Sequence, residues 1–242
     1  MKKFICLVVL IMSILVTGCA NDTIENSSDR QNADINSNIN DNKTTNTEEK
    51  SKEIEIDTKN IYKDIDVLSM KKAMEPIFLE MYNDKVSYKD CQSGEYLSKI
   101  VYSIINTYFT DEKDSVTELN YDATGFYIAM DLNKVSEYLK AGFNSYGGDL
   151  VENYTSSENM IMQYLPGYNA YGIVPADGGP IASIKVLNAH KNGDNTYEAT
   201  VGVTIEDDTK SQNIGRYVVS MVKNDDSSSK FQYRISDIEK DV

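Results

Sequence analysis

The side chains that enzymes most often use for catalysis are scarce in this sequence. It contains one histidine, His190, and three cysteines, Cys6, Cys19 and Cys91. A Ser-His-Asp triad would have to use His190, and the G-x-S-x-G turn of many serine hydrolases is absent. Zinc sites of the usual kind need three or four His or Cys ligands, which this chain does not offer. We therefore expect no catalytic residue of these classes, no cofactor and no metal.

Carboxylates are the remaining groups that could perform acid–base chemistry. Adjacent aspartates at 207–208 and 225–226 could in principle serve as the two carboxylates of a glycosidase. Both pairs lie in polar stretches typical of turns, where solvated charge is the ordinary explanation. No D-x-D-x-D-G calcium loop and no phosphate-binding glycine loop occur. Because carboxylate pairs are present, a cell-envelope glycan hydrolase that uses such a pair is kept as the alternative function.

A group of tyrosines forms the candidate binding site. Between residues 154 and 180 the sequence interleaves aromatic side chains with prolines and glycines. Tyrosine combines a flat apolar face with a hydroxyl, which suits contact with saccharides or peptides. A chain without tryptophan can also use tyrosine as half-buried packing, and this second interpretation is favoured. The candidate ligand-binding residues are Tyr154, Tyr164, Tyr168 and Tyr171.

The N-terminus carries the most specific motif. Two lysines are followed by an apolar run over residues 4–16, too short to span a bilayer comfortably. The run ends in Val16-Thr17-Gly18-Cys19, which resembles the lipobox of bacterial lipoproteins. This resemblance implies diacylglycerol on the Cys19 sulfur and cleavage after Gly18. It also implies, in many members, an acyl chain such as palmitate on the new amine.

Charge and cysteine usage agree with an exported, lipid-anchored protein. The formal net charge is −14, so the surface repels nucleic acid and anionic headgroups. We therefore expect no nucleic-acid partner, and we expect membrane contact through the lipid on Cys19. Once Cys6 is removed and Cys19 is lipidated, Cys91 remains alone and no intrachain disulfide can form. The predicted location is the extracytoplasmic face of the cell membrane.

Composition divides the chain into three parts. Residues 1–18 are the predicted signal peptide. Residues 19–58 hold the lipidated cysteine and a stretch of Asn, Asp, Ser, Thr, Glu and Lys that has too few apolar side chains to fold, so a disordered tether is predicted. All tyrosines lie beyond residue 60, and residues 59–242 have the length of a single globular domain.

The first half of this domain has helical periodicity. Apolar residues spaced three and four apart predict helices over 67–82 and 94–109. Pro76 lies inside the first segment, so that helix either starts near Glu75 or is kinked there. Residues 126–130 resemble a short strand, after which Asp131 can cap a short amphipathic helix.

The second half has the alternation of β-strands. Two extended runs joined at 192–194 predict a hairpin, and residues 214–223 and 230–238 repeat the pattern across a polar turn. We expect an α+β fold in which the N-terminal helices pack on one face of a curved C-terminal antiparallel meander. Residues 154–180 are expected to form an irregular connection between the two halves.

The order of elements over residues 67–240 resembles the cone-shaped NTF2-like and cystatin-like folds. The globular part also resembles uncharacterised lipoproteins of low-GC Gram-positive bacteria, a likeness that implies no activity. The leading hypothesis is a non-catalytic binding domain with a peptide, glycan or envelope protein as partner. A solute receptor of an ABC transporter is a weaker third class, because such receptors have two lobes and this chain has the length of about one domain.

Overall fold

A computed structural model describes residues 66–156 and 160–241 of the chain. These residues belong to one compact unit. The predicted signal peptide, Cys19 and the tether lie outside the described residues, so those predictions stay untested. Within the described ranges, no helix is long and apolar enough to cross a membrane.

The helices confirm the helical periodicity of the first half. Asp66 caps the first 3-10 turn by accepting a hydrogen bond from Ser69 N, and α1 continues directly from that turn. Pro76 therefore lies inside α1, which starts at Lys71 rather than near Glu75. The helical segments are η1 (Val67–Met70), α1 (Lys71–Asn83), η2 (Asp90–Gln92), α2 (Gly94–Tyr108), η3 (Lys113–Ser115), α3 (Tyr121–Thr124) and α4 (Leu132–Gly142).

A five-stranded antiparallel sheet takes three of its strands from the region expected to be an irregular connection. Its strand order is β1-β2-β5-β4-β3. The expectation of an irregular segment is therefore wrong for residues 154–155, 161–165 and 170–173, which form three of the five strands. The strands of this sheet are short, and β5 is buried on both faces. They therefore lack the alternation of apolar and polar residues that identifies longer strands. The strands are β1 (Val116–Glu118), β2 (Ile128–Asp131), β3 (Tyr154–Thr155), β4 (Ile161–Leu165) and β5 (Ala170–Ile173).

A glycine permits the close packing of β5 against β4. A Cβ atom at Gly172 would lie 2.6 Å from the Leu165 side chain, closer than carbon atoms approach each other. The turn between the two strands is closed by a hydrogen bond from Tyr168 N to Leu165 O, and Asn169 adopts a positive φ of 48°. Turn chemistry rather than hydrophobic alternation thus defines this hairpin.

The four-stranded sheet is the predicted meander. Its strands pair in chain order, β6 (Ile181–Lys191), β7 (Thr196–Glu206), β8 (Ser211–Lys223) and β9 (Tyr233–Lys240). The predicted hairpin at 192–194 is confirmed, with Asn192 N bonded to Thr196 O. Alternate residues of β7 are buried, as the sequence predicted: Ala199, Val201, Val203 and Ile205.

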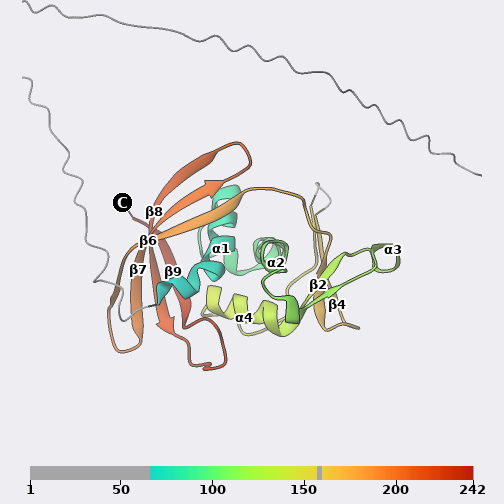
Figure 1. Cartoon of the computed structure of the whole chain (residues 1–242). Coiled ribbons are helices and arrows are strands. Elements are labelled where there is room, and N and C mark those ends of the chain that lie inside the picture. Colours follow the sequence, from blue (N-terminus) through green and yellow to red (C-terminus); the bar gives the residue numbers. More distant parts are fainter. Residues whose placement is uncertain (1–65, 157–159, 242) are drawn as a thin grey trace, which may run out of the picture. The chain divides into compact units, whose positions relative to one another are not determined.

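The helices lie between the two sheets, so that the α+β fold has three layers (Figure 1). On one side, α1 packs against β6 and α4 packs against β9. On the other side, α2 packs against β3, β4 and β5. The expected packing of helices on one face of the meander is confirmed, and the second sheet covers their opposite side. The resemblance to NTF2-like and cystatin-like folds stays a prediction.

Candidate ligand-binding groove

A groove follows the seam between α1 and α2. It consists of two cavities of about 800 and 140 Å³ that share Leu79 and Ser103 as lining residues. The opposite wall is formed by residues 176–180 and the first residues of β6. Figure 1 shows the β5–β6 connection running past α1 and α2 from one sheet to the other. We call this feature the α1–α2 groove.

Helical spacing and two hydrogen bonds position the groove walls. Residues three and four apart on a helix lie on one face, which brings Tyr102, Ser103 and Asn106 of α2 to the seam. The Tyr102 hydroxyl donates to Val174 O over 2.8 Å. Asn106 Oδ1 accepts a hydrogen bond from Ala176 N over 3.0 Å. The connection between the sheets is thereby fixed to α2.

Glu80 is a buried acid in the wall of the larger cavity. Its residue surface is 6% exposed, and its Oε1 accepts no hydrogen bond from any described residue. Lys99 Nζ lies 3.8 Å from that oxygen, within ion-pairing distance but too far for a hydrogen bond. Burial, followed by a hydrogen bond with Asp84, raises the pKa of Glu80 to about 8. Glu80 is therefore protonated and neutral at neutral pH.

Lys99 is held by two other carboxylates. Its Nζ lies 2.6 Å from Asp84 Oδ2 and 3.0 Å from Glu95 Oε1. Although burial alone would lower the pKa of the Lys99 ammonium, the hydrogen bonds to Asp84 and Glu95 raise it above its usual value. The hydrogen bond with Glu80 and the one from Lys99 lower the pKa of Asp84. The cluster thus holds one neutral acid, two carboxylates and one cation.

Two aromatic rings border this cluster. The ammonium of Lys99 lies 5.5 Å from the ring centroid of Tyr96 and 6.0 Å from that of Tyr154. Both distances are within the range of cation–π attraction. Tyr154 is 7% exposed and lines the larger cavity. An aromatic face, a neutral acid and charged carboxylates therefore meet at one end of the groove.

The four tyrosines proposed from the sequence occupy four different environments. Tyr154 lines the groove, whereas Tyr171 is fully buried and its hydroxyl lies 3.2 Å from Val151 O. Tyr164 is half-buried, packs on the Tyr171 ring at 5.5 Å and donates to Asn169 Oδ1 over 3.0 Å. Tyr168 is 51% exposed in the turn between β4 and β5. The fold does not bring these four side chains together around one cavity.

Sequence reasoning missed the acids of the groove. The buried face of α1 includes Ala73, Pro76 and Ile77, and residue 80 continues this i, i+4, i+7 stripe. An acid at a stripe position was the signal that could have identified Glu80. Asp84 follows one turn later on the same side of the helix. Lys99 had no comparable signal, since a lysine on an amphipathic helix is ordinarily solvent-exposed.

The other acidic and histidine candidates have ordinary environments. Asp207 and Asp226 accept hydrogen bonds from Thr209 N and Ser228 N inside turns, over 2.8 and 2.9 Å. His190 lies on β6, half-exposed, with its Nε2 3.5 Å from Glu198 Oε1. No group of three His, Cys, Asp or Glu side chains within residues 66–156 and 160–241 is arranged to hold a metal ion.

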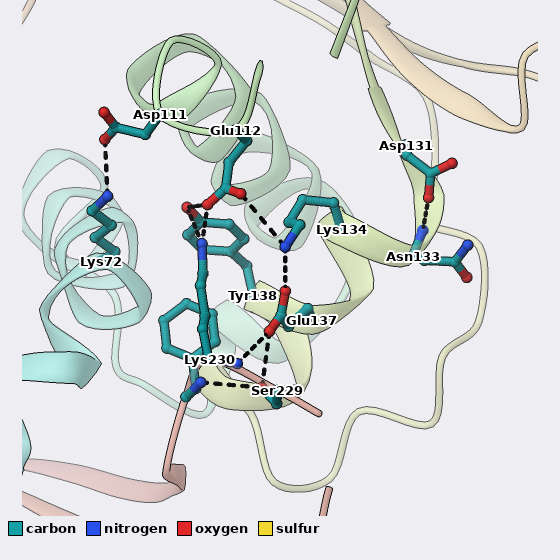
Figure 2. A network of polar contacts seen from close by, with 11 residues as sticks. Lys72, Asp111, Glu112, Asp131, Asn133, Lys134, Glu137, Tyr138, Ser229 and Lys230 are labelled. Carbon is teal, nitrogen blue, oxygen red and sulfur yellow. Dashed lines mark hydrogen bonds and ion pairs between the residues drawn. The ribbon is translucent and has the colours of Figure 1, made fainter. Parts of the chain in front are cut away.

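A second polar cluster serves as an internal comparison. Figure 2 shows Glu112 in contact with Lys134, Tyr138 and Lys230, and Glu137 in contact with Lys134 and the residues of the β8–β9 hairpin. The Tyr138 hydroxyl donates to Glu112 over 2.8 Å, and Lys134 bonds to Glu137 over 2.7 Å. Lys230 forms an ion pair with Glu112.

The carboxylates of this second cluster find their hydrogen-bond donors within the protein. Both of its carboxylates carry several hydrogen bonds, and the backbone N of Lys230 donates to Glu137 over 2.7 Å. These contacts fix α4 to the hairpin between β8 and β9 (Figure 2). Although a polar cavity of about 660 Å³ adjoins the cluster, neither carboxylate has an oxygen like Glu80 Oε1, which is buried without a donor. The α1–α2 groove is therefore the stronger candidate site.

Comparison with known proteins gives no assignment. The sequence matches no protein-family model, no curated protein and no solved structure.

Proposed function

We propose that this chain is a lipoprotein anchored by Cys19 at the extracytoplasmic face of the cell membrane, and that its domain binds a ligand in the α1–α2 groove. The proposal for the anchor rests on the lipobox-like residues 16–19. The proposal for the groove rests on one observation, the buried Glu80 carboxyl whose Oε1 has no hydrogen-bond donor among the described residues. A ligand that supplies a donor would satisfy this acceptor.

Binding is favoured over hydrolysis by the position of the two acids. The carboxyls of a glycosidase flank the scissile bond from two sides. Glu80 lies on α1 and Asp84 caps its C-terminus four residues later, so both belong to one wall of the groove. In addition, Asp84 Oδ2 forms an ion pair with Lys99 Nζ over 2.6 Å. This arrangement suits recognition of a polar ligand better than attack on a bond held between two carboxylates.

The hydrolase alternative has one supporting observation. The pKa of Glu80 is raised and the pKa of Asp84 is lowered, a separation that assigns a general acid and a general base in many enzymes. Glycan cleavage that is lost in Glu80→Gln and retained in the distant control Glu239→Gln would support hydrolysis. Absence of cleavage by purified protein on cell-wall glycan would remove this alternative.

The anchor has a direct test. Cys19→Ala should abolish incorporation of labelled palmitate and release the protein from the membrane fraction, because the thiol that accepts the lipid is gone. Cys91→Ala is the matched control and should keep both label and membrane association. Unchanged labelling of the Cys19 variant would contradict the predicted lipidation.

The groove has a separate test. Ser103 lines both cavities and Thr155 lies exposed at the rim, so Ser103→Trp and Thr155→Trp should block the groove. Ser236→Trp, on an exposed position of β9, is the control. On arrays of peptides and glycans, the compounds that bind the wild-type protein most strongly should no longer bind either blocking variant. They should still bind the control variant. Retention of all partners by both blocking variants would move the binding site elsewhere.

A further inference from the structure

The charge of the α1–α2 groove indicates the chemistry of its ligand. This inference rests on the proposed binding function of the groove. The described lining residues of the two cavities include one lysine, Lys99, and six carboxyl side chains: Glu75, Glu80, Asp84, Glu95, Asp177 and Glu206. Since opposite charge favours encounter and binding, the groove suits a cation.

Lys99 does not neutralise the groove by itself. Its ammonium is engaged by Asp84 and Glu95 at hydrogen-bonding distances, and these two carboxylates already outnumber it. The third neighbour, Glu80 Oε1, lies 3.8 Å away and remains without a donor from the described residues. A second N–H donor that carries positive charge is therefore the group that this cluster lacks.

The walls are also suited to an ammonium group. The ring of Tyr154 lines the cavity and already lies near one ammonium, that of Lys99. Aromatic faces attract cations, and the attraction strengthens where water is excluded. Neutral side chains between the charges, Asn83, Ser103 and Thr155, offer hydrogen bonds to amide groups.

The acids are distributed along the groove. Glu75 on α1 and Asp84 at its C-terminal cap lie at opposite ends of the segment that lines the two cavities. At about 1.5 Å per residue, nine residues of helix separate them by about 13 Å along the axis. A single small cation cannot occupy both ends, whereas an extended chain with several cations can.

We propose that the α1–α2 groove binds an extended peptide segment bearing lysine ammonium groups, one of which binds beside Lys99 at the carboxyl groups of Glu80, Asp84 and Glu95. Ammonium binding at this position requires Glu80 to give up its proton, because the ionised carboxylate attracts the cation and the neutral acid does not. One proton is therefore released to solvent for each peptide bound.

The pH dependence follows from the groups around Glu80. Burial and Asp84 hold the proton on Glu80, whose pKa is about 8, so binding should tighten as pH rises towards 8. Below pH 8, each rise of one pH unit lowers the Kd by up to about tenfold, because Glu80 must lose one proton for the peptide to bind. The charged and titratable groups that face Glu80 from α1, η2, α2, β3 and the β5–β6 connection are Asp84, Cys91, Glu95, Lys99, Tyr154 and Asp177.

The test is calorimetric titration of the full-length protein in neutral detergent with a short, end-blocked peptide of alternating lysine and alanine. The expected result is binding that tightens up to about tenfold between pH 6 and pH 7. The same peptide with acetylated lysines keeps the backbone but loses the charge, so it should bind at least about tenfold more weakly. Equal binding of the acetylated peptide would overturn the proposal.

Two Glu→Gln variants, one in the groove and one outside it, separate a specific site from general attraction to an acidic protein. Glu80→Gln resembles the neutral acid in shape, so the fold should persist, while peptide binding weakens and its pH dependence between pH 6 and pH 7 disappears. Glu239→Gln removes one charge from an exposed position of β9 and should change neither. The assignment of Glu80 to the binding site would be overturned if both substitutions weakened peptide binding equally. It would also be overturned if the pH dependence of binding were unchanged in Glu80→Gln.

The remaining outcomes distinguish this inference from the proposed function. Spermidine carries amines without a peptide backbone, and affinity equal to that of the peptide would overturn the assignment to a peptide. Neutral partners that are lost in Ser103→Trp, with no binding of the lysine peptide, would overturn the inference and leave the binding function in place. Loss of no partner in either tryptophan variant would overturn both.

Discussion

The Tyr88 hydroxyl lies 2.8 Å from the carbonyl oxygen of Ile235, on a strand 147 residues later in the chain. It also lies 3.0 Å from the carbonyl oxygen of Gly142 at the end of α4. Tyr88 is 2% exposed, and its ring stacks on that of Phe143 with centroids 5.5 Å apart. One side chain therefore joins the α1–α2 connection, α4 and β9 in the interior.

Tyr88→Phe should destabilise the domain while the ring packing is kept. The substitution leaves the two buried carbonyl groups without this hydroxyl, at a cost of about 1–3 kcal/mol in the free energy of unfolding. Urea unfolding followed by circular dichroism measures the change. Tyr168→Phe is the control, because its side chain is 51% exposed and it should alter stability by less than about 0.5 kcal/mol. Equal stability of the two variants would contradict the role of Tyr88.

Glu80 should make the domain less stable as pH rises. Its pKa in the folded state is about 8, above the ordinary value of 4.5, so the folded protein holds a proton that the unfolded chain has lost. The favourable contribution is complete below pH 4.5 and is lost as pH rises through 8. Between pH 4.5 and pH 7 the loss amounts to roughly 3 kcal/mol.

Glu80→Gln should remove this decline, because glutamine cannot ionise. The measurement is the free energy of unfolding of both proteins in urea from pH 5 to pH 9. The difference between variant and wild type isolates Glu80 from carboxyls such as Asp84, whose lowered pKa has the opposite effect. Parallel pH curves for the two proteins would show that Glu80 is ionised in the folded state.

Glu112 should stabilise the attachment of α4 to the β8–β9 hairpin. Its side chain is 12% exposed and contacts Lys134, Tyr138 and Lys230 (Figure 2). Glu112→Gln leaves two partly buried lysines without this carboxylate, and we expect a loss of about 2–4 kcal/mol in the free energy of unfolding. Glu118→Gln, at an exposed position of β1, should change it by less than about 0.5 kcal/mol.

The Glu112 effect should also depend on pH with a defined sign. Burial would raise the pKa of Glu112, but hydrogen bonds from Lys230 and Tyr138 hold it below the ordinary value of 4.5. Its contribution is therefore present above pH 4.5 and is lost as pH falls through the lowered pKa. Stability curves of wild type and Glu112→Gln should converge in acid. A gap that stays constant would assign the effect to packing.

Cys91 should be unreactive in the folded protein. It is fully buried, and burial together with the nearby Glu80 carboxyl raises the pKa of the thiol to about 12. Since the thiolate is the reactive form, a disulfide reagent should modify Cys91 only on unfolding. The measurement uses the chain without residues 1–18 and with Cys19→Ala, so that Cys91 is the one thiol left. Rapid modification in native buffer would contradict its burial.

The sequence by itself determined the elements with strong local signals. Apolar spacing on 94–109 gave the position of α2, and Asp131 was correctly identified as the cap of α4, with its Oδ1 accepting from Asn133 N over 2.7 Å. Alternation and the turn at 192–194 likewise identified β6 and β7. These features depend on residues close in the chain, so periodicity and capping chemistry suffice to predict them.

The second sheet was decided by tertiary structure. Strands β2 and β5 pair across about forty residues, with Met130 opposite Tyr171, and each has only four residues. The sequence predicted a short strand over 126–130, but the pairing of β2 with β5 joins residues far apart in the chain, and local patterns do not reveal it. The strands within 154–180 were missed because they are short and because turn residues rather than hydrophobic alternation define the β4–β5 hairpin.

The groove was decided in the same way. Glu80 on α1 and Asp84 at its C-terminal cap are local neighbours, but Lys99 comes from α2 and Tyr154 from β3. The raised pKa of Glu80 comes from the packing of these elements around it, and the sequence around residue 80 shows only that an acid continues the buried stripe of α1. The lipid attachment proposed at residues 16–19 could be predicted from sequence because such a motif is contiguous in the chain, and it stays a prediction. A site assembled from three elements becomes visible only once the fold has brought them together.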